Sequence, residues 1–330
     1  MFLNEMKKED LRIVFMGTPE FAVETLQSLV ENNYNVVAVV TQPDKPVGRH
    51  GSILQPSAVK QYAQSKNIPV LQPVKMKDEG FIEELKSFNA NLQIVVAFRM
   101  LPEIVWDMPE YGTFNVHAAL LPQYRGAAPI NWAVINGETR TGVTTFFLDH
   151  EIDTGRVIMQ LPYDILDDYN VEDVYNGLMH LGAEICLKTL DKIIESDGYP
   201  ESMAQNEMGI DINTLKHAPK IFKDTCRIDW NKPNANVYNF VRGLSPYPGA
   251  WTMLVDSSGK EIVLKVFKTK KSALSFSNEA GTIHVEQKSL FIQAKDGAIE
   301  VLELQIAGKT RMKANEFING FKNIERYIVK

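Results

Sequence analysis

Short β-branched apolar runs alternate with amphipathic segments of helical spacing near the start of this chain. We expect strands at residues 11–16, 36–40 and 93–97, and helices at 21–29, 57–64 and 81–88. Strands separated by helices of this length predict a mostly parallel sheet with right-handed crossovers. In such sheets ligands bind beyond the carboxyl ends of the strands. The pattern therefore predicts an α/β domain with a site at one edge of its sheet.

The first expected strand is followed by the loop MGTPEF. Gly17 ends the strand, Thr18 suits the N-cap of a helix, and Pro19 suits its first position. Glu20 favours the positive end of the helix dipole. Because neither a G-x-G-x-x-G nor a P-loop pattern follows, dinucleotide or nucleoside triphosphate binding is poorly supported. The start of the helix either shapes one wall of a cleft or has only the structural role of ending the strand and beginning the helix.

The chain has 330 residues, which is more than one hydrophobic core usually organises, so two domains are expected. A long amphipathic helix over 171–196 precedes a polar, irregular segment of the kind found in linkers. Short β-rich runs then recur between turns, as in a small barrel or sandwich. These runs are 261–267, 281–285, 290–294 and 299–304. We place a first domain at 1–198, a linker at 199–217 and a second domain at 218–330.

Charge is distributed unevenly along the chain, whose formal net charge is -6. Residues 221–330 carry 17 Lys+Arg against 11 Asp+Glu, whereas residues 1–220 carry 18 against 30. A basic module joined to an acidic one indicates that the C-terminal part meets a polyanion. A solvated lysine face is the alternative.

Membrane and metal functions find no support in the sequence. No run approaches the roughly 18 apolar residues that a membrane helix needs, so we expect a soluble, cytoplasmic protein, with a monomer as the default. Cys186 and Cys226 are the only cysteines, and neither has the spacing of a zinc ligand or a disulfide framework. No metal is therefore expected.

The triplet Asn115-Val116-His117 ends an expected strand at 113–116. Period-two geometry sends Asn115 and His117 to the same side of that strand. An Asn amide is a neutral donor and a His is a donor that can carry charge, so the pair suits a developing oxyanion. Ordinary polar residues at a strand end are the alternative, and spacing alone favours it.

Asp153 lies in the loop DHEIDTG, after another expected strand at 142–148. Its carboxylate could pair with His117, keep that residue protonated, or relay a proton from an attacking amine through water. Asp149 and Glu151 are weaker candidates for the same role. The alternative is an acidic turn without chemistry.

Segments in both halves of the chain resemble the methionyl-tRNA formyltransferase family. They are GTPEFA, VTQPDKPVGR, FNVHAALLPQYRGAAPINWAVINGETRTGVT and DTG, then RIDWNKP, LSPYPGAW and LQIAGKTRM. The resemblance runs from about Leu11 to the C-terminus, and its longest segment is the most specific. It implies a Rossmann-like formyltransferase domain followed by an OB-like β-barrel that binds tRNA.

In that family 10-formyltetrahydrofolate donates its formyl group to the α-amino group of methionine on initiator tRNA, and no metal is required. By resemblance, Asn115, His117 and Asp153 are the catalytic residues. The folate-binding stretch falls on Ala119, Leu120, Leu121 and Pro122. The loop 41–56 approaches the tRNA acceptor end, with Lys45 and Arg49 as its contacts. A solvated loop is the alternative for both.

Two segments depart from the family pattern. After Arg49 the chain reads His50-Gly51-Ser52, where relatives are often more basic. At 97–103 it reads AFRMLPE, where relatives commonly carry a Tyr-Gly pair, so Arg99 either alters the pterin-side wall or points to solvent. Five basic residues of the second domain could line the acceptor arm: Lys220, Arg242, Lys309, Arg311 and Lys313.

Two other functions stay open at this point. A folate-dependent formyltransferase with another acceptor, glycinamide ribonucleotide or a nucleotide-linked amino sugar, would share much of the first domain. A protein that binds RNA without catalysis is the alternative from another class. The presence of all three polar residues in their matching positions argues against it.

Overall fold

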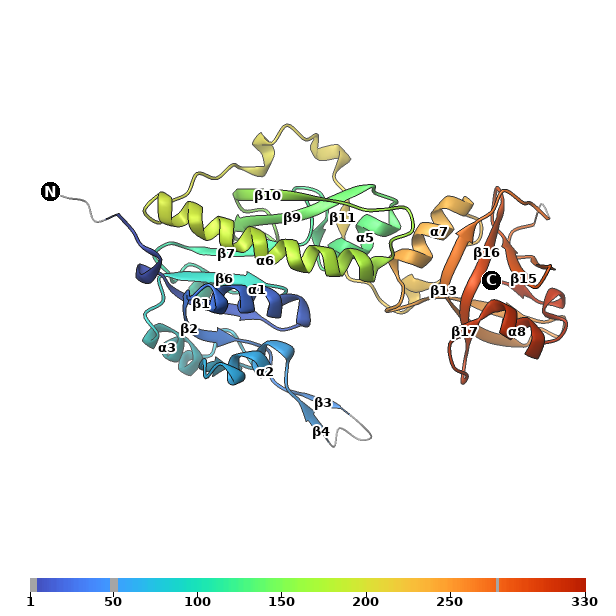
Figure 1. The fold of residues 1–330 in the computed structure, drawn as a ribbon, viewed down its shortest axis with the longest axis horizontal. Coiled ribbons are helices and arrows are strands. Elements are labelled where there is room, and N and C mark those ends of the chain that lie inside the picture. The colour runs from blue at the N-terminus through green and yellow to red at the C-terminus, as the bar shows by residue number, and fades with distance from the viewer. Residues whose placement is uncertain (1–4, 48–52, 277–278) are drawn as a thin grey trace. The chain divides into compact units, whose positions relative to one another are not determined.

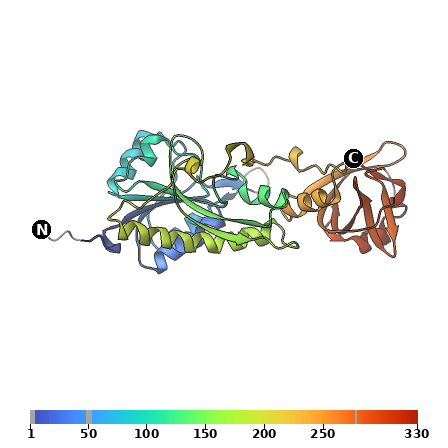
Figure 2. The same ribbon diagram turned by 90° about the horizontal axis from the view of Figure 1, so that it is seen from above.

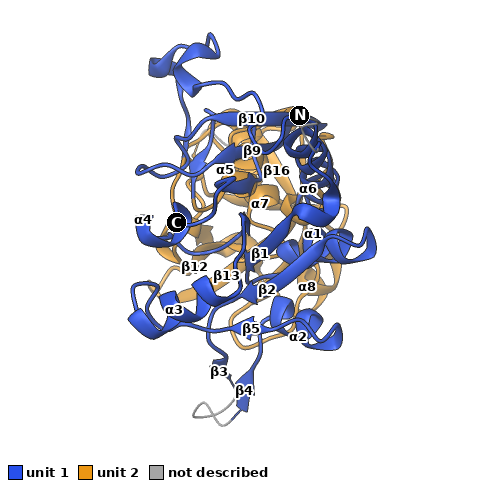
Figure 3. Ribbon diagram, turned by 90° about the vertical axis from the view of Figure 1, so that its left-hand side faces the viewer, with its two compact units in different colours: residues 1–126, 141–164, 175–217 blue, residues 127–140, 165–174, 218–330 orange. Residues whose placement is uncertain are grey.

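The computed structural model describes residues 5–47, 53–276 and 279–330 of the chain (Figure 1). The chain divides into two compact units, each assembled from three segments (Figure 3). Unit 1 consists of residues 1–126, 141–164 and 175–217. Unit 2 consists of residues 127–140, 165–174 and 218–330.

Unit 1 is built on a seven-stranded sheet. Its strands are β1 (Arg12–Gly17), β2 (Asn35–Val40), β5 (Val70–Leu71), β6 (Leu92–Val96), β7 (Thr113–His117), β9 (Arg140–Phe147) and β10 (Val157–Asp164). Their order is β10-β9-β7-β6-β1-β2-β5. The ladders that join β5, β2, β1, β6 and β7 are parallel, whereas β9 pairs antiparallel with β7. The expected mostly parallel sheet is confirmed.

Helices cover both faces of this sheet. They are α1 (Glu20–Glu31), α2 (Ala58–Ser65), α3 (Glu79–Ser87), α4 (Glu103–Trp106) and α6 (Val171–Glu195). In Figure 3, α1, α2 and α6 lie on one side of the sheet, with α3 and α4 on the other. Val14 and Met16 of β1 belong to the core cluster that contains Phe81, Ile82 and Leu85 of α3. The alternation of the strand thus directs every second side chain to each layer.

Helix starts follow the expected capping chemistry at α2 and α3 but not at α1. The Ser57 hydroxyl accepts from the backbone N–H of Lys60, and the Asp78 carboxylate caps α3 in the same way. At α1 the N-cap is Pro19, without a side-chain cap, so the prediction of Thr18 as N-cap is wrong. Because Pro19 is extended, Thr18 lies one residue too far from the helix, and its buried Oγ1 has no partner among the described residues.

Unit 2 contains a mainly antiparallel sheet, as the β-rich runs predict. Its strands are β12 (Ala250–Val255), β13 (Glu261–Lys271), β14 (Ile283–Glu286), β15 (Ser289–Gln293), β16 (Ala298–Ile306), β17 (Met312–Lys313) and β18 (Ile328–Val329). The order is β14-β15-β16-β13-β12-β18, and β17 pairs with β16. An isolated bridge between Thr282 and Ile328 brings the two edges together. Within the described residues no longer ladder closes this sheet into a barrel.

The described residues of unit 2 also form the helices α5 (Pro129–Ile135), α7 (Asn234–Gly243) and α8 (Ala314–Gly320). Val237 and Val241 of α7 and Phe317 of α8 lie in one core cluster with residues from the sheet. Figure 2 draws the β-rich part of the unit in orange and red. Burial of this apolar surface is the main source of the unit's stability.

Short strands also occur among the described residues: β3 (Lys45–Val47), β4 (Ile53–Gln55), β8 (Arg125–Gly126) and β11 (His217–Ala218). Single 3-10 turns occur at Lys8–Asp10, Gln205–Glu207, Ile212–Thr214, Asp224–Cys226 and Ile324–Arg326. Among the helices that the structure describes, none combines the length and apolar character needed to cross a bilayer. Cys186 and Cys226 are both buried free thiols.

Arg242 does not belong to a basic surface, contrary to the prediction. Its side chain is only 8% exposed. Its Nε donates to Asn239 Oδ1, and its Nη1 donates to the Tyr169 carbonyl at 2.8 Å. Burial lowers the pKa of the Arg242 guanidinium from its usual value. The Asn239 side chain and the Tyr169 carbonyl provide the partners that permit this burial. The other four basic residues, Lys220, Lys309, Arg311 and Lys313, are exposed.

Candidate active site

Strand β7 gives Asn115 and His117 a common direction. The strand lies between β6 and β9, with Asn115 opposite Val95 on one side and Phe146 on the other. Val116 points to the opposite face, towards α6, where a methyl group on Gly182 would lie 3.6 Å from its Cγ1. Asn115 and His117 therefore share the face that α6 does not cover.

The imidazole of His117 is buried, with 6% of its side chain exposed. Its Nε2 lies 3.0 Å from the carbonyl oxygen of Tyr124. A carbonyl only accepts, so Nε2 carries a hydrogen and donates it. Tyr124 has a φ of +60°, the left-handed conformation, and its carbonyl is directed at the ring from there. Nδ1 makes no hydrogen bond to any residue that the structure describes.

Asp153 lies beside the free edge of this imidazole. Its Oδ2 is 3.9 Å from His117 Nδ1, which is too long for a hydrogen bond but close enough for an ion pair when the ring is protonated. The same oxygen accepts the backbone N–H of Gly126 at 2.9 Å. The exposed fraction of the Asp153 side chain is 13%. The three residues predicted as a group thus include one pair, His117 and Asp153, in close contact.

The loop that carries Asp153 takes an indirect path. Because β9 is antiparallel to β7, its last residue, Phe147, pairs with Phe114, and Thr144 pairs with His117. The chain must therefore turn back to bring Asp153 to the imidazole. It does so with Asp153 at a φ of +56°, and with Gly155, whose added Cβ would lie 1.7 Å from the Phe147 carbonyl oxygen. The glycine of the DTG motif is required for that close approach.

The Asn115 side chain makes no hydrogen bond to any described residue, and its Oδ1 atom is buried. A buried polar atom without a partner costs about 1–3 kcal/mol. Such an atom at the end of a strand is typical of a site that completes its hydrogen bonds with a ligand. The amide is thus available for a substrate group that reaches this edge of the sheet.

The stretch Ala119–Pro122 follows His117 directly and is held by two side chains of neighbouring strands. The Thr144 hydroxyl accepts from the Leu121 N–H at 3.1 Å and donates to the Ala119 carbonyl at 2.6 Å. Gln160 donates to the Leu121 carbonyl and to the same hydroxyl. Ala119, Leu121 and Pro122 are buried, and Leu120 is partly exposed.

Two family models match the chain: formyl transferase over residues 11–190, and formyl transferase, C-terminal domain, over 220–322. A methionyl-tRNA formyltransferase from Parabacteroides distasonis is 59% identical over 98% of this chain and 100% of its own length. One from Flavobacterium johnsoniae is 50% identical over 94% of this chain and 96% of its own length. The chain belongs to the methionyl-tRNA formyltransferase family.

Solved structures share the fold at much lower identity. An N-formyltransferase from Helicobacter canadensis, solved with folinic acid and dTDP-3-aminofucose, superposes with a TM-score of 0.62 at 19% identity. The match covers 88% of this chain and 98% of that one. HypX from Aquifex aeolicus, in complex with tetrahydrofolic acid, gives a TM-score of 0.60 at 18% identity, over 93% of this chain and 47% of that one. The Rossmann-like formyltransferase fold of the first domain is therefore shared.

The loop predicted over 41–56 contains a hairpin of β3 and β4, in which Lys45 pairs with Gln55. Lys45 is exposed. The base of the hairpin is held by Asp44, whose carboxylate accepts from Lys60 Nζ at 2.7 Å and from Gln72 Nε2 at 2.7 Å. These hydrogen bonds lower the pKa of Asp44 from its usual value. Arg49 and the segment His50-Gly51-Ser52 lie outside the described residues.

Arg99 does not point to solvent, so that alternative is wrong. Its Nη1 donates to the Val74 carbonyl at 2.9 Å and its Nη2 donates to the Pro73 carbonyl. Burial lowers the pKa of the guanidinium, and its Nε has no partner among the described residues. Arg99 thus ties the turn after β6 to the segment around Pro73.

Several residues near the site escaped the sequence analysis. Thr144 and Gln160 hold the stretch 119–122 by hydrogen bonds to its backbone. Gln205 donates to the Asp153 carbonyl and accepts from Arg125. Arg125 belongs to the YRG motif, so the resemblance contained a signal for it. Gln205 lies 52 residues after Asp153 in a polar segment, where no pattern marks it.

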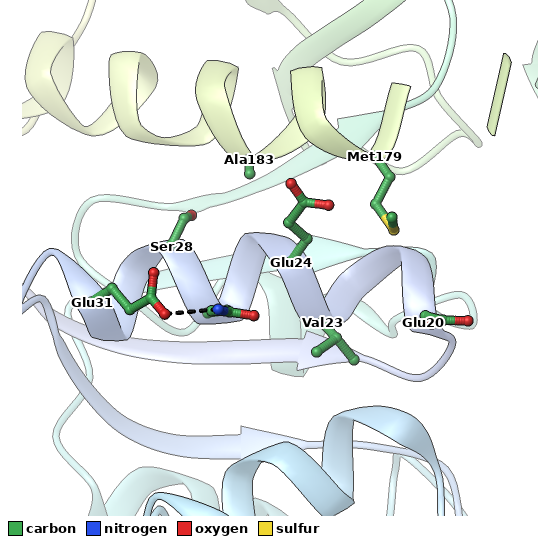
Figure 4. A pocket seen from close by; sticks show the side chains of 8 residues that line it. Glu20, Val23, Glu24, Ser28, Glu31, Met179 and Ala183 are labelled. Carbon is green, nitrogen blue, oxygen red and sulfur yellow. Dashed lines mark hydrogen bonds between the residues drawn. The ribbon is translucent and has the colours of Figure 1, made fainter. Parts of the chain in front are cut away.

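A hollow of about 370 Å³ lies between α1 and α6, away from these residues. Figure 4 shows its lining, with Glu20, Glu24 and Glu31 from α1 and Met179 and Ala183 from α6. Glu24 also contacts the imidazole of His180. None of the predicted site residues lines this hollow. Within the described residues, no cluster of three or more His, Cys, Asp or Glu side chains has the arrangement of a metal site.

Proposed function

We propose that the chain transfers the formyl group of 10-formyltetrahydrofolate to the α-amino group of methionyl initiator tRNA, for translation initiation. One observation carries the proposal. His117 is fixed between the Tyr124 carbonyl and the Asp153 carboxylate, beside an Asn115 amide without a partner among the described residues. Relatives that match 94–98% of the chain at 50–59% identity are named methionyl-tRNA formyltransferase.

The chemistry begins when the lone pair of the methionyl amine attacks the formyl carbon. The carbonyl π electrons then move to oxygen, and the N–H groups of the Asn115 amide and a proton on His117 Nδ1 stabilise the resulting oxyanion. Asp153 assists the transfer of the amine proton, through water, to the folate nitrogen. The bond between that nitrogen and the formyl carbon breaks, which yields N-formylmethionyl-tRNA and tetrahydrofolate. No metal takes part in this scheme.

Low solvent exposure around His117 and Asp153 supports these roles. A developing charge interacts more strongly with fixed donors where water is largely excluded. Tyr124 occupies the Nε2 hydrogen in the structure, so the Nδ1 edge is the one that remains for a substrate or a water. A proton on Nδ1 would face Asp153 across the 3.9 Å separation.

Folate and tRNA bind to different parts of the sequence in this proposal. In this proposal residues 1–198 form the catalytic domain, with folate at Ala119, Leu120, Leu121 and Pro122. Residues 199–217 are a linker and residues 218–330 an OB-like tRNA-binding domain. Lys45, which is exposed, and Arg49 of the same sequence segment contact the acceptor end, and exposed Lys and Arg side chains of unit 2 track phosphates. The protein acts in the cytoplasm as a monomer.

An acceptor assay tests the proposal. The protein is mixed with 10-formyltetrahydrofolate and, in separate reactions, methionyl initiator tRNA, glycinamide ribonucleotide or a nucleotide-linked amino sugar. We expect formyl incorporation into the charged tRNA. Incorporation only into a small acceptor would reject the proposed acceptor, and folded protein without any incorporation would favour a protein that only binds RNA.

The contribution of the hairpin is tested separately with Arg49→Ala. We expect weaker tRNA use that falls further as salt is raised, because a phosphate contact depends on ionic strength. The affinity for folate should stay unchanged. Loss of folate binding instead would show that this segment contacts the folate and not the tRNA, contrary to the proposal.

A further inference from the structure

Gln205 is a buried amide whose hydrogen-bonding capacity is fully used. It is 5% exposed, in the 3-10 turn Gln205–Glu207. Its Oε1 accepts from Arg125 Nε at 3.0 Å and from Arg125 Nη2 at 2.6 Å. Its Nε2 donates to the carbonyls of Asp153 and Gly155, both at 2.9 Å. An amide has two acceptor sites and two N–H groups, so none is left over.

These four hydrogen bonds connect the backbone of the Asp153 loop to Arg125, which lies next to the residue that binds the Asp153 carboxylate. The two carbonyls belong to Asp153 itself and to Gly155, the residue that has no room for a Cβ. The guanidinium belongs to Arg125, whose neighbour Gly126 donates its N–H to the Asp153 carboxylate. Gln205 therefore joins the backbone of Asp153 to the strand that holds the Asp153 side chain.

Asp153 needs such support because its φ of +56° is uncommon for a residue with a side chain. A conformation of this kind persists only when the surrounding structure determines it. A small rotation about this backbone would move the carboxylate away from His117 Nδ1, and misplacement by about 1 Å can cost a hundredfold in rate. The hydrogen bonds of Gln205 to Arg125, Asp153 and Gly155, which we call the Gln205 clamp, oppose that rotation.

We propose that Gln205 is a positioning residue for formyl transfer, which holds the Asp153 loop in register with the imidazole of His117. The proposal rests on the proposed function of Asp153. It adds a requirement that the motifs do not contain, because Gln205 lies in the segment between the two matched family domains.

Attachment of the segment 199–217 to unit 1 is a different role, and other contacts already supply it. Met203 and Val157 exchange two backbone hydrogen bonds of 2.8 Å. Gln123 accepts the Lys216 N–H at 2.8 Å and donates to the Thr214 carbonyl. Gln123 thus tethers the same segment with the same side chain type, without a contact to Asp153. It provides a matched control.

The test uses the full-length chain with Gln205→Met, Gln205→Glu and Gln123→Met. Met keeps the approximate volume of Gln205 without its hydrogen bonds. Glu keeps the oxygen that accepts both Arg125 N–H groups but places its second carboxylate oxygen against two carbonyl oxygens. We expect both Gln205 variants to lower kcat by about tenfold to a hundredfold while the KM for 10-formyltetrahydrofolate stays within about twofold. Gln123→Met should keep kcat within about twofold, because it loses only the tether.

The Glu variant separates the two halves of the clamp. If attachment to Arg125 were enough, Gln205→Glu would retain the wild-type kcat, and the proposal would fail. Thermal unfolding is recorded for each variant, and kcat is compared among variants that are folded at the assay temperature. If Gln205→Met does not fold, Gln205→Glu carries the comparison.

A double-mutant cycle with Asp153→Asn identifies the residue through which Gln205 acts. If Gln205 positions Asp153, Gln205→Met should cost less than about twofold further in the Asp153→Asn background. Losses that multiply would overturn the proposal, as would an unchanged kcat in both Gln205 variants. Near-normal turnover of Asp153→Asn alone would instead reject the role of Asp153 in the proposed function. The two failures are therefore distinguishable.

Discussion

Strand β7 and the loop 148–156 bring their polar side chains to the same place by different means. The backbone of β7 is paired on both sides, with β6 and with β9, and its Phe114 and Val116 are buried. The loop has no such ladder. It depends on a left-handed Asp153, on a glycine with no room for a Cβ, and on the hydrogen bonds of Gln205.

The difference shows which parts of the site are supported by secondary structure and which by single contacts. Asn115 and His117 are aligned because any strand aligns alternate residues. Asp153 is held instead by contacts of single residues, among them Gly126 and Gln205, which lie outside the loop. Substitutions that leave β7 intact should therefore still abolish catalysis when they disturb the loop.

Gly155→Ala should produce the largest effect, because it places a methyl group against the carbonyl oxygen of Phe147. We expect kcat for formyl transfer to fall by about a hundredfold or more, since the Asp153 backbone must shift. The control is Gly182→Ala, whose methyl would lie in ordinary contact, 3.6 Å from Val116 on the strand side. The kcat of both variants is measured by steady-state kinetics. A similar kcat in the two would contradict the expectation that the loop tolerates an added methyl group less well than the surroundings of β7.

Thr144→Val should have an intermediate effect, on folate binding. It leaves the Leu121 N–H and the Ala119 carbonyl without their hydroxyl partner, at a cost of about 1–3 kcal/mol for each buried group. We expect the KM for 10-formyltetrahydrofolate to rise by about tenfold, with tRNA use less affected. Thr141→Val is the matched control, because the buried Thr141 hydroxyl has no partner among the described residues. Equal KM values for 10-formyltetrahydrofolate in the two variants would refute the assignment of residues 119–122 to folate binding.

Asp44→Asn should have the smallest effect and should leave strand β7 and the loop 148–156 of the candidate site unchanged. It weakens the contacts to Lys60 and Gln72 at the base of the β3–β4 hairpin, so we expect a rise of about twofold in the KM for charged tRNA alone. Hydrogen bonds from Lys60, then from Gln72, lower the pKa of Asp44. The carboxylate therefore stabilises the fold above the pKa of the unfolded chain, and this contribution is lost as pH falls through the folded-state pKa.

Amide hydrogen exchange in β3 measures this dependence on pH. Protection in the wild-type chain should approach that of Asp44→Asn as the pH falls through the lowered pKa of Asp44. A difference between the two chains that stays constant down to the lowest pH would show that the carboxylate does not hold the hairpin.

Local patterns were sufficient to predict most of the sheet and the strand side of the site. The apolar run before Gly17 and the segments at 36–40 and 93–97 form β1, β2 and β6 within one or two residues. Each of these elements buries a face that its own sequence specifies. The same reasoning assigned Asn115 and His117 to a common direction.

Features that depend on distant partners were not predicted. Nothing near residues 140–147 indicates that β9 runs antiparallel to β7, because direction is decided by pairing and not by periodicity. The β3–β4 hairpin was missed since Pro46 and the surrounding charges are unusual in strands. Arg242 was assigned to the surface from its charge alone, whereas carbonyls at 165–174 provide partners that permit its burial.

The most direct test of the central claim is the rate of formyl transfer from 10-formyltetrahydrofolate to methionyl initiator tRNA by His117→Ala, Asp153→Ala and the double variant. If strand and loop form one catalytic centre, each single variant should lower kcat by about a hundredfold or more while remaining folded. The double variant should then be little slower than the slower single variant, because residues that act as a unit are not additive. Near-wild-type turnover in either single variant would contradict the account.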